Sequence, residues 1–284
     1  MESVSKKTTL VPNRNSFNTY VKVSSMDFEA QNKLAKTFKS LHIPGNPLIL
    51  ANVYDGAATK KLLENNTTKA VATASYAIAA THGVQDDELT WEQNLASVRT
   101  IAKVALKFAI PLSVDIQDGY EDLEATIRSV IEVGAVGCNL EDVNSIDSSL
   151  RSKEDAVARI KTVLKVAKDI GVPEFVVNAR TDILGFDDGT LEDAITRARA
   201  YLAAGATCAF VWGGMRGRGL RTEEVEGLVE ALDGRLSIMM SLAPNILTIP
   251  ELRKIGVSRI SVGPGIFLTA MRAFGDQVAV MLSQ

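Results

Sequence analysis

The sequence predicts an α/β protein of the (β/α)8 barrel class, in which eight parallel strands alternate with helices and close into a cylinder. Short apolar runs recur along the chain, and most are followed by a segment of helical periodicity and then by Gly or Pro. Strands that alternate with helices imply a parallel sheet. Eight such units also fit the size of this barrel, which is typically about 250 residues.

The predicted elements begin with a helix at 27–41, where Phe28, Leu34, Phe38 and Leu41 form one apolar stripe. Eight apolar runs then predict strands, at 48–53, 70–75, 111–116, 135–140, 175–181, 208–213, 237–242 and 259–263.

Several of the intervening helices have recognisable ends. Ser152 is a suitable N-cap with Asp155 three residues later, and Gly171 ends the helix that follows. The segment 191–204 likewise ends at Gly205. These signals separate the runs into strand and helix pairs.

An open doubly wound sheet is the alternative arrangement of the same elements. Such a sheet would carry a glycine-rich phosphate-binding motif after its first strand. The first run is instead followed by NVYDGAATKK, which contains neither G-x-G-x-x-G nor a P-loop. The sequence therefore favours the closed barrel.

The domain organisation is predicted to be simple. Residues 1–26 are rich in Ser, Thr and Asn, with Lys6, Lys7, Arg14 and Lys22 against the single acid Glu2. This composition predicts a flexible tail or one that lies on a partner, and an organelle-targeting segment is the alternative. Residues 27–284 then form a single barrel domain.

Composition excludes several classes of partner. The net charge is -3 and the pI about 5.6, so no basic surface points to nucleic acid. No uninterrupted apolar run approaches the roughly 18 to 20 residues that span a bilayer, so we expect no membrane contact. Cys138 and Cys208 have no metal-ligand spacing, which favours a reducing compartment. We expect a cytoplasmic protein, with a mitochondrial location open because of the basic tail.

Side-chain alternation along the predicted strands places a set of polar groups inside the barrel. One face of each strand meets the helices and the other meets the barrel axis. The polar inward positions collect at the C-terminal ends of their strands, where active sites of this architecture lie. They are Thr73, Ser75, Ser113, Asp115, Gln117, Asn139, Glu141, Asn178, Arg180, Ser261 and Gly263.

Two carboxylates, Asp115 and Glu141, would then converge with the guanidinium of Arg180. A buried carboxylate pair is costly unless a cation or a proton intervenes. Oxygen ligands without His or Cys favour Mg²⁺ or Mn²⁺ over Zn²⁺, and Arg180 offers a bidentate donor to a substrate carboxylate. A structural ion pair between Asp115 and Arg180 remains the alternative.

Six stretches of the sequence carry a resemblance to a known family. They are NVYDGAA (52–58), ATASYAIAATHGVQDDE (72–88), SVDIQDGY (113–120), GAVGCNLED (134–142), NARTD (178–182) and RISVGPG (259–265). In this order, and on or beside predicted strand ends, they resemble the isocitrate lyase/phosphoenolpyruvate mutase superfamily, on its phosphonomutase-like branch. The resemblance implies a (β/α)8 barrel, commonly a tetramer in which the last helix packs on a neighbouring subunit. It also implies Mg²⁺-dependent chemistry on small 2-oxo or 2-hydroxy carboxylates.

The resemblance assigns roles at the metal. Asp115 matches the direct metal ligand, Asp86 an acid that reaches the metal through water, and Glu141 an acid of its outer shell. The superfamily usually has a second carboxylate two residues after the metal ligand, where this chain has Gln117. An amide can orient a bound water there, but it lowers the negative charge of the site.

The resemblance also assigns the substrate site. Ser75 and Tyr76 match a turn whose backbone N–H groups bind the substrate carboxylate, and Arg180 matches the arginine that binds its oxygens. We expect Asn178, which points inward, and Asn245, which follows the seventh run, to line this site. Arg180, Glu141 and Asp86 are the predicted catalytic residues.

The connection after the fourth run departs from the carbon–carbon lyases of the superfamily. Those enzymes carry a loop with Lys, Cys and His whose cysteine supplies a proton, whereas residues 142–151 read DVNSIDSSLR. Cys138 faces the helices by parity and cannot replace that cysteine. This argues against isocitrate lyase itself and leaves the proton donor unassigned.

Three functions follow from these observations. The first is a Mg²⁺-dependent lyase or hydrolase that breaks a C–C bond in an oxaloacetate-like or methylisocitrate-like carboxylate through an enolate. The second is a C–P bond mutase or phosphonate hydrolase. The third is a barrel that binds a carboxylate without catalysis. The predicted partners are the small carboxylate and further copies of the chain, as a tetramer or a dimer of dimers.

Overall fold

The computed structural model describes residues 27–214, 219–242 and 247–283, and the predicted tail at 1–26 lies outside them. The strands are β1 (Leu48–Leu50), β2 (Asn52–Val53), β3 (Val71–Thr73), β4 (Leu112–Asp115), β5 (Gly137–Leu140), β6 (Val176–Thr181), β7 (Cys208–Val211), β8 (Leu236–Met239) and β9 (Arg259–Ser261).

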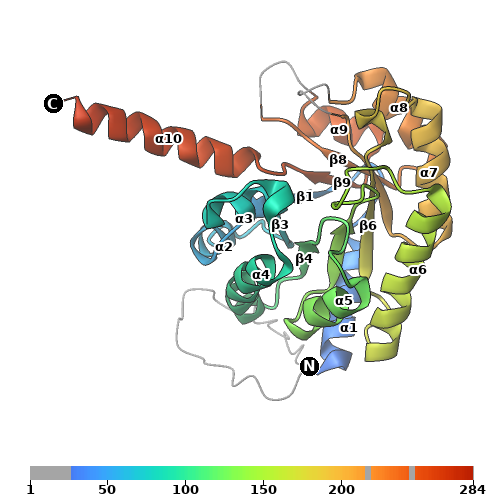
Figure 1. Cartoon of the computed structure of the whole chain (residues 1–284), viewed down its shortest axis with the longest axis horizontal. Coiled ribbons are helices and arrows are strands. Elements are labelled where there is room, and N and C mark those ends of the chain that lie inside the picture. The colour runs from blue at the N-terminus through green and yellow to red at the C-terminus, as the bar shows by residue number, and fades with distance from the viewer. Residues whose placement is uncertain (1–26, 215–218, 243–246, 284) are drawn as a thin grey trace, which may run out of the picture.

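Helices alternate with these strands and surround the sheet (Figure 1). They are α1 (Phe28–Ser40), α2 (Gly56–Leu63), α3 (Ser75–His82), α4 (Trp91–Ala105), α5 (Leu123–Glu132), α6 (Lys153–Ile170), α7 (Leu191–Ala203), α8 (Thr222–Ala231), α9 (Ile249–Ile255) and α10 (Gly265–Leu282). Short 3₁₀ helices are η1 (Asp86–Glu88), η2 (Leu106–Phe108) and η3 (Ile183–Gly185).

The strands form one parallel sheet in the order β1-β9-β8-β7-β6-β5-β4-β3-β2. β1 pairs with β9 and β2 pairs with β3, while only Ala51 separates β1 from β2. The predicted first run at 48–53 is therefore two short strands, each bonded to one edge of the sheet. This arrangement closes the barrel and confirms the predicted fold class.

The side chain of Asn52 joins the two edges at this closure. Its amide nitrogen donates to the carbonyl oxygen of Thr73 at 2.8 Å. Its Oδ1 accepts the backbone N–H groups of Val262 at 3.1 Å and Gly263 at 3.0 Å. One buried amide thus satisfies backbone groups of β3 and of the turn after β9, which a continuous ladder would otherwise have to pair.

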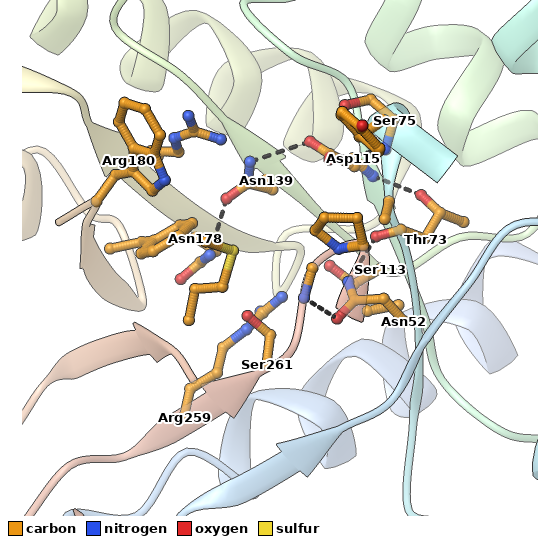
Figure 2. Close-up of a pocket in the computed structure, with 18 of the residues that line it drawn as sticks. Asn52, Thr73, Ser75, Ser113, Asp115, Asn139, Asn178, Arg180, Arg259 and Ser261 are labelled. Atoms are coloured by element: carbon orange, nitrogen blue, oxygen red, sulfur yellow. Dashed lines mark hydrogen bonds between the residues drawn. The ribbon is translucent and has the colours of Figure 1, made fainter. Parts of the chain in front are cut away.

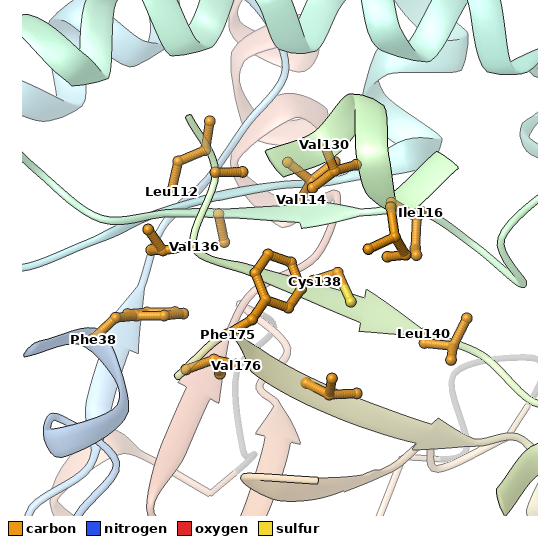
Figure 3. Close-up of a cluster of buried hydrophobic side chains, with 14 of the residues drawn as sticks. Phe38, Leu112, Val114, Ile116, Val130, Val136, Cys138, Leu140, Phe175 and Val176 are labelled. Atoms are coloured by element: carbon orange, nitrogen blue, oxygen red, sulfur yellow. The ribbon is translucent and has the colours of Figure 1, made fainter. Parts of the chain in front are cut away.

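The outward faces of the strands build the apolar layer between sheet and helices (Figure 3). The positions that alternate with the predicted inward ones on two adjacent strands are all buried in this layer: Leu112, Val114, Ile116, Val136, Cys138 and Leu140. Burying each large aliphatic side chain contributes about 1.5–3 kcal/mol. Cys138 lies among these groups and not in the barrel interior, as the alternation predicts.

Helix α1 covers the N-terminal end of the barrel, opposite the predicted site. The Gln31 amide donates to the carbonyl oxygens of Ile131 at 2.9 Å and Ala135 at 2.7 Å, both in the segment that leads into β5. Phe38 is fully buried, and a Cβ added at Gly137 would lie 2.9 Å from its ring. The ring of Phe38 therefore fills the space that a larger residue at Gly137 would occupy.

Helix α10 leaves the barrel and projects away from it (Figure 1). None of its residues is buried, and Phe274 is 67% and Met281 64% exposed. By length and composition it is the one helix among the described residues that could cross a membrane. Arg272 and Asp276 interrupt its apolar sequence, so it is not an uninterrupted apolar run, and the absence of membrane contact stays a prediction.

We expect Gly137→Ala to destabilise the barrel. The added methyl group would lie 2.8 Å from the carbonyl oxygen of Val176 and 2.9 Å from Phe38. Overpacking of this kind costs about 1–3 kcal/mol. The free energy of unfolding from urea titration measures the effect.

The matched control is Gly227→Ala within α8, where nothing lies within 4 Å of the added methyl group. This change should stabilise the protein by about 0.5–1 kcal/mol, because Ala has the higher helix propensity. Equal effects of the two substitutions would contradict the packing described for Gly137.

Candidate active site

Most of the predicted inward positions line a cavity of about 200 Å³ at the C-terminal ends of the strands, but Gln117 and Glu141 are not among its lining residues (Figure 2). Of the predicted inward residues, the cavity is lined by Thr73, Ser75, Ser113, Asp115, Asn139, Asn178, Arg180, Ser261 and Gly263. The residues come from five strands, β3, β4, β5, β6 and β9, and from the turns after β3 and β9, so the closed barrel is what brings them together.

Asp115 lies at the end of β4, and hydrogen bonds fix both its side chain and its backbone. Its Oδ2 accepts the backbone N–H of Ser75 at 3.0 Å, and its Oδ1 accepts the Asn139 amide at 3.0 Å. Its own N–H donates to the hydroxyl of Thr73 at 2.8 Å, and Asn94 donates to its carbonyl oxygen at 3.0 Å. The carboxylate is therefore fixed in one orientation toward the cavity.

A chain of amides sets that orientation (Figure 2). The Oδ1 of Asn139 accepts the Asn178 amide at 2.9 Å, and the Oδ1 of Asn178 accepts the thiol of Cys208 at 3.0 Å. Each donor thus determines which way the next amide faces, up to Asp115. Asn178 acts through Asn139 in this arrangement, and direct contact between Asn178 and a substrate stays a prediction.

Arg180 projects from β6 and is held by two acids. Its Nη1 donates to Glu141 Oε1 at 2.7 Å, and its Nε and Nη2 donate to Asp182 Oδ1 at 3.0 and 2.5 Å. Its guanidinium lies 4.9 Å from the ring centre of Trp212. Burial alone would lower the pKa of Arg180, but the charges of Asp182 and Glu141 raise it above the ordinary value. Arg180 therefore carries a fixed positive charge.

The alternative ion pair between Asp115 and Arg180 does not form. Among the residues described, the acids within ion-pair distance of Arg180 are Glu141 and Asp182. Asp115 instead receives neutral donors, which leaves part of its charge available to a ligand.

Asp86 faces this site from η1. The amide nitrogen of Gln117 donates to the Asp86 carbonyl oxygen at 2.6 Å and to its carboxylate at 3.1 Å. Burial, and then the negative charge of Asp115, raise the pKa of Asp86. Gln117 has a φ of 50°, a left-handed conformation that costs a non-glycine residue about 1–3 kcal/mol. Its amide is thus held against Asp86 at the expense of backbone strain.

Glu141 lies on the side of the site formed by Arg180. Burial raises its pKa well above the ordinary value, and the positive charge of Arg180 acts in the opposite direction. The structure places Glu141 in an ion pair with Arg180, and its predicted place in the outer shell of a metal stays a prediction.

The donor set fits an ion that keeps much of its own water. In the described part of the chain, no group of three His, Cys, Asp or Glu side chains could enclose a metal. The available ligands are oxygens. Asp115 lies near enough to Asp86 for its negative charge to raise the pKa of Asp86. Mg²⁺ is bound in this way, by one or two carboxylates and several waters, whereas Zn²⁺ prefers four protein ligands that include His or Cys.

The remaining predicted residues lie at the edge of the site. Tyr76 lines the cavity and is 44% exposed, while Asn245 lies outside the described residues. The connection at 142–151 forms a tight loop, in which Val143 bridges to Leu150 and Arg151 pairs with Asp118 at 2.7 Å. Asp118 thus pairs with the loop and is not among the lining residues of the cavity.

Several site residues were missed from the sequence. Asn94 of α4 reaches both Asp115 and the hydroxyl of Tyr120, at 3.0 and 2.8 Å. Phe210 and Trp212 flank Arg180, and Arg259 lines the cavity. Asn94 gave no signal because it lies on a helix, whereas the inward position of Arg259, two residues before Ser261, could have identified it.

Comparison with known proteins identifies a family. The family model described as phosphoenolpyruvate phosphomutase matches residues 38–282. An uncharacterized protein of Mycobacterium tuberculosis (strain CDC 1551 / Oshkosh) is 29% identical over 80% of this chain and 81% of its own length. The 2-methylisocitrate lyase of Escherichia coli (strain K12) is 33% identical over 43% of this chain and 42% of its own. The oxaloacetate decarboxylase of Rhodopseudomonas palustris (strain CGA009) is 30% identical over 57% of both chains.

Solved structures agree with this relationship. A protein from Burkholderia cenocepacia J2315, provisionally described as a phosphonomutase, superposes with a TM-score of 0.77 at 32% identity, over 88% of this chain and 98% of that one. A 2,3-dimethylmalate lyase, described as a member of the PEP mutase/isocitrate lyase superfamily, has a TM-score of 0.74 at 23% identity, over 89% and 87%. The second likeness establishes the fold alone.

We expect Asp86→Asn to stabilise the metal-free protein at neutral pH. A raised pKa means that the folded state binds this proton more tightly than the unfolded state does. The charged Asp86 carboxylate therefore lowers the free energy of unfolding, and this loss is complete above the pKa that Asp86 has in the folded state. It is absent below the pKa that Asp86 has in the unfolded state. Urea titrations in EDTA should show the variant more stable than the wild type at pH 8, with the difference reduced toward pH 3.5.

The control is Asp87→Asn. Asp87 is the exposed neighbour of Asp86, so this change removes one negative charge from the surface and leaves the charge of the cavity unchanged. A loss of stability at pH 8 in Asp86→Asn would contradict the unfavourable environment assigned to this carboxylate.

Proposed function

The chain belongs to the phosphoenolpyruvate phosphomutase family, and we propose that it is a Mg²⁺-dependent enzyme that cleaves a C–C bond in a small 2-oxo or 2-hydroxy di- or tricarboxylate. The family and its relatives are lyases or mutases of the isocitrate lyase/PEP mutase superfamily, so the chain is an enzyme of that kind. The observation that carries the specific proposal is the fixed Asp115 carboxylate in the same cavity as Arg180.

The named activities of the curated relatives support cleavage of a C–C bond. The curated relatives include 2-methylisocitrate lyase and oxaloacetate decarboxylase, both of which act beside carboxylates. These matches cover about half of each relative, so they support the reaction class and leave the substrate as a proposal.

The residues of the cavity suit an enolate. When the bond to the carbon beside a 2-oxo group breaks, its electron pair remains on that carbon and spreads onto the oxo oxygen. For oxaloacetate, loss of the terminal carboxylate as CO₂ leaves the enolate of pyruvate, which takes a proton from water. Arg180, with its fixed charge, would bind the oxygens of the substrate. The first turn of α3 would hold its carboxylate at Tyr76, while the N–H of Ser75, which already donates to Asp115, would position that acid.

A Mg²⁺ ion, when bound, would polarise the 2-oxo group as a Lewis acid. Asp115 would hold it directly, while Asp86, Glu141 and Gln117 would act on its waters. Asn139, Asn178 and Cys208 would keep Asp115 in its orientation. The tight 142–151 loop offers no Cys, His or Lys as a proton donor, so we assign protonation to water.

Cleavage of a C–P bond is the second candidate. The family description and the Burkholderia cenocepacia structure support it directly. A phosphonate and a dicarboxylate would use the same cation-binding and arginine groups, so substrate tests must include both. Binding without turnover is the remaining alternative, which the replacement of a carboxylate by Gln117 favours.

We expect a panel of oxaloacetate, substituted malates, 2-methylisocitrate and phosphonopyruvate to identify the reaction. One of the carboxylates should yield pyruvate or another 2-oxo acid in the presence of Mg²⁺. Asp115→Ala should reduce kcat/KM by at least about 100-fold, because the charge that holds the cation is removed. Product formation is followed by coupled reduction with NADH, after subtraction of the enzyme-free rate.

Asp187→Ala, an exposed carboxylate outside the cavity, is the matched control and should keep full activity. Turnover of phosphonopyruvate alone would favour the C–P reaction. Tight binding of oxalate without turnover of any compound would favour a carboxylate-binding protein.

We infer that α10 mediates self-association. An apolar stripe at helical spacing runs along it, opposite a polar face that contains Thr269, Arg272 and Asp276. The stripe consists of Phe267, Met271, Phe274, Val278 and Met281. An exposed apolar surface of this length favours burial against another subunit, which fits the predicted tetramer or dimer of dimers.

Phe274→Asp should therefore shift the chain toward the monomer. A carboxylate at the centre of the stripe would be desolvated in an interface. Light scattering after size exclusion measures the mass, and Thr269→Asp on the polar face is the control with the same added charge. A monomeric wild type would contradict the inference.

A further inference from the structure

Arg259 is a buried cation that has no ion-pair partner within 27–214, 219–242 and 247–283. It lies at the start of β9, is 2% exposed and lines the cavity described above. Its Nε and Nη1 have no hydrogen-bond partner, and it forms no ion pair with any described residue. Figure 2 shows its side chain running from β9 into the barrel interior, between Asn178 and Asn52.

The groups around Arg259 do not neutralise it. The ring centre of Phe38 lies 6.0 Å from its guanidinium carbon, and the thiols of Cys138 and Cys208 are close enough to interact with its charge. The carboxylate of Asp115 also acts on this charge, but it is not within ion-pair distance, and burial still lowers the pKa of Arg259. Burial, and then the charge of Arg259, lower the pKa of nearby His42 to about 3, so this imidazole stays neutral. Among the described residues, the positive charge of Arg259 is therefore offset only from a distance, by Asp115, and by no acid in direct contact.

A second polar group beside Arg259 also lacks a partner. Ser237 of β8 is the register neighbour of Arg259, is fully buried, and its hydroxyl makes no hydrogen bond among the described residues. Buried polar groups are nearly always hydrogen-bonded, to protein, water or ligand. Only Arg259 of these two lines the cavity, and its unsatisfied N–H groups indicate that something in the cavity binds them.

A purely structural role does not account for these features. A guanidinium that only filled the barrel would be costlier than an unbranched apolar side chain, because an unpaired buried charge loses its solvation. The cavity has a volume of about 200 Å³, equal to several water molecules at roughly 30 Å³ each. It has room for a compact four-carbon dicarboxylate.

We propose that Arg259 is a second anion subsite, which binds the carboxylate of the substrate that lies farther from Asp115 and Arg180. The inference rests on the proposed function, because it assigns the substrate of the same cavity to the dicarboxylates. One carboxylate and the 2-oxo group are bound at the mouth by Arg180 and α3. The other enters the barrel, where the free N–H groups of Arg259 satisfy it.

Binding measurements test this subsite without requiring turnover. Succinate and butyrate have the same number of carbons and differ in whether the far end is a carboxylate or a methyl group, and 2-oxobutyrate probes the mouth of the site alone. Calorimetric titration in Mg²⁺ should show that the wild type binds succinate about 10–100-fold more tightly than butyrate, the range expected of hydrogen bonds to a charged group.

Arg259→Met should lose this preference and bind 2-oxobutyrate as the wild type does. Met has a similar length and no charge, so thermal unfolding should show a folded variant. Arg259→Lys keeps the charge and should retain part of the preference. The distinguishing readout is thus the ratio of the two affinities, which a loss of folded protein does not change.

Equal affinities for succinate and butyrate in the wild type would overturn the proposal, whatever the variants do. A parallel loss of succinate and 2-oxobutyrate binding in Arg259→Met would also overturn it, by showing a structural role. Succinate binding that depends on Arg259, without turnover of any panel compound, would support the subsite and count against the lyase. Turnover that is abolished by Asp115→Ala, together with an unchanged ligand preference in Arg259→Met, would support the lyase and overturn the subsite.

Discussion

The site depends on the way in which one carboxylate is held at the end of one strand. Asp115 is bound by the backbone of α3, by the amide of Asn139 and, behind it, by Asn178 and Cys208. These groups belong to five consecutive positions around the sheet, from β3 to β7. A shift in the register of any one strand would turn its inward group toward the helices. The parallel ladder and the orientation of Asp115 are therefore one constraint.

Charge is distributed along the cavity so that the acids lie at its mouth. Asp86, Asp115 and Glu141 interact there with one another, and Arg180 is the cation held among them. Arg259 lies at the start of its strand, and no acid of the described residues lies within ion-pair distance of it. A bound dicarboxylate with a divalent cation would neutralise both regions, which links the metal and the substrate in a single electrostatic arrangement.

The sequence anticipated much of the site because strand alternation is strict. Thr73, Ser113, Asp115, Asn139, Asn178 and Arg180 were assigned inward positions from their neighbours alone, and all of them line the cavity. Strand alternation could not predict which side chains form hydrogen bonds or ion pairs with one another. Arg180 pairs with Glu141 and Asp182 and not with Asp115, since the direction of a long side chain depends on acids from other strands. Asn94 was not predicted because it lies on a helix, to which strand alternation does not apply.

The sequence by itself determined the barrel, the face of each strand and the family, since these follow from local periodicity and from motifs of adjacent residues. Only the tertiary structure decided how the barrel closes through Asn52, that Gln117 contacts Asp86, and that Arg259 has no ion-pair partner in the described part of the chain. It also decided that α10 leaves the barrel with Met271, Phe274 and Met281 of its apolar stripe exposed, while Phe267 packs on Tyr54. Each of these depends on distances between residues far apart in the chain, which periodicity does not encode.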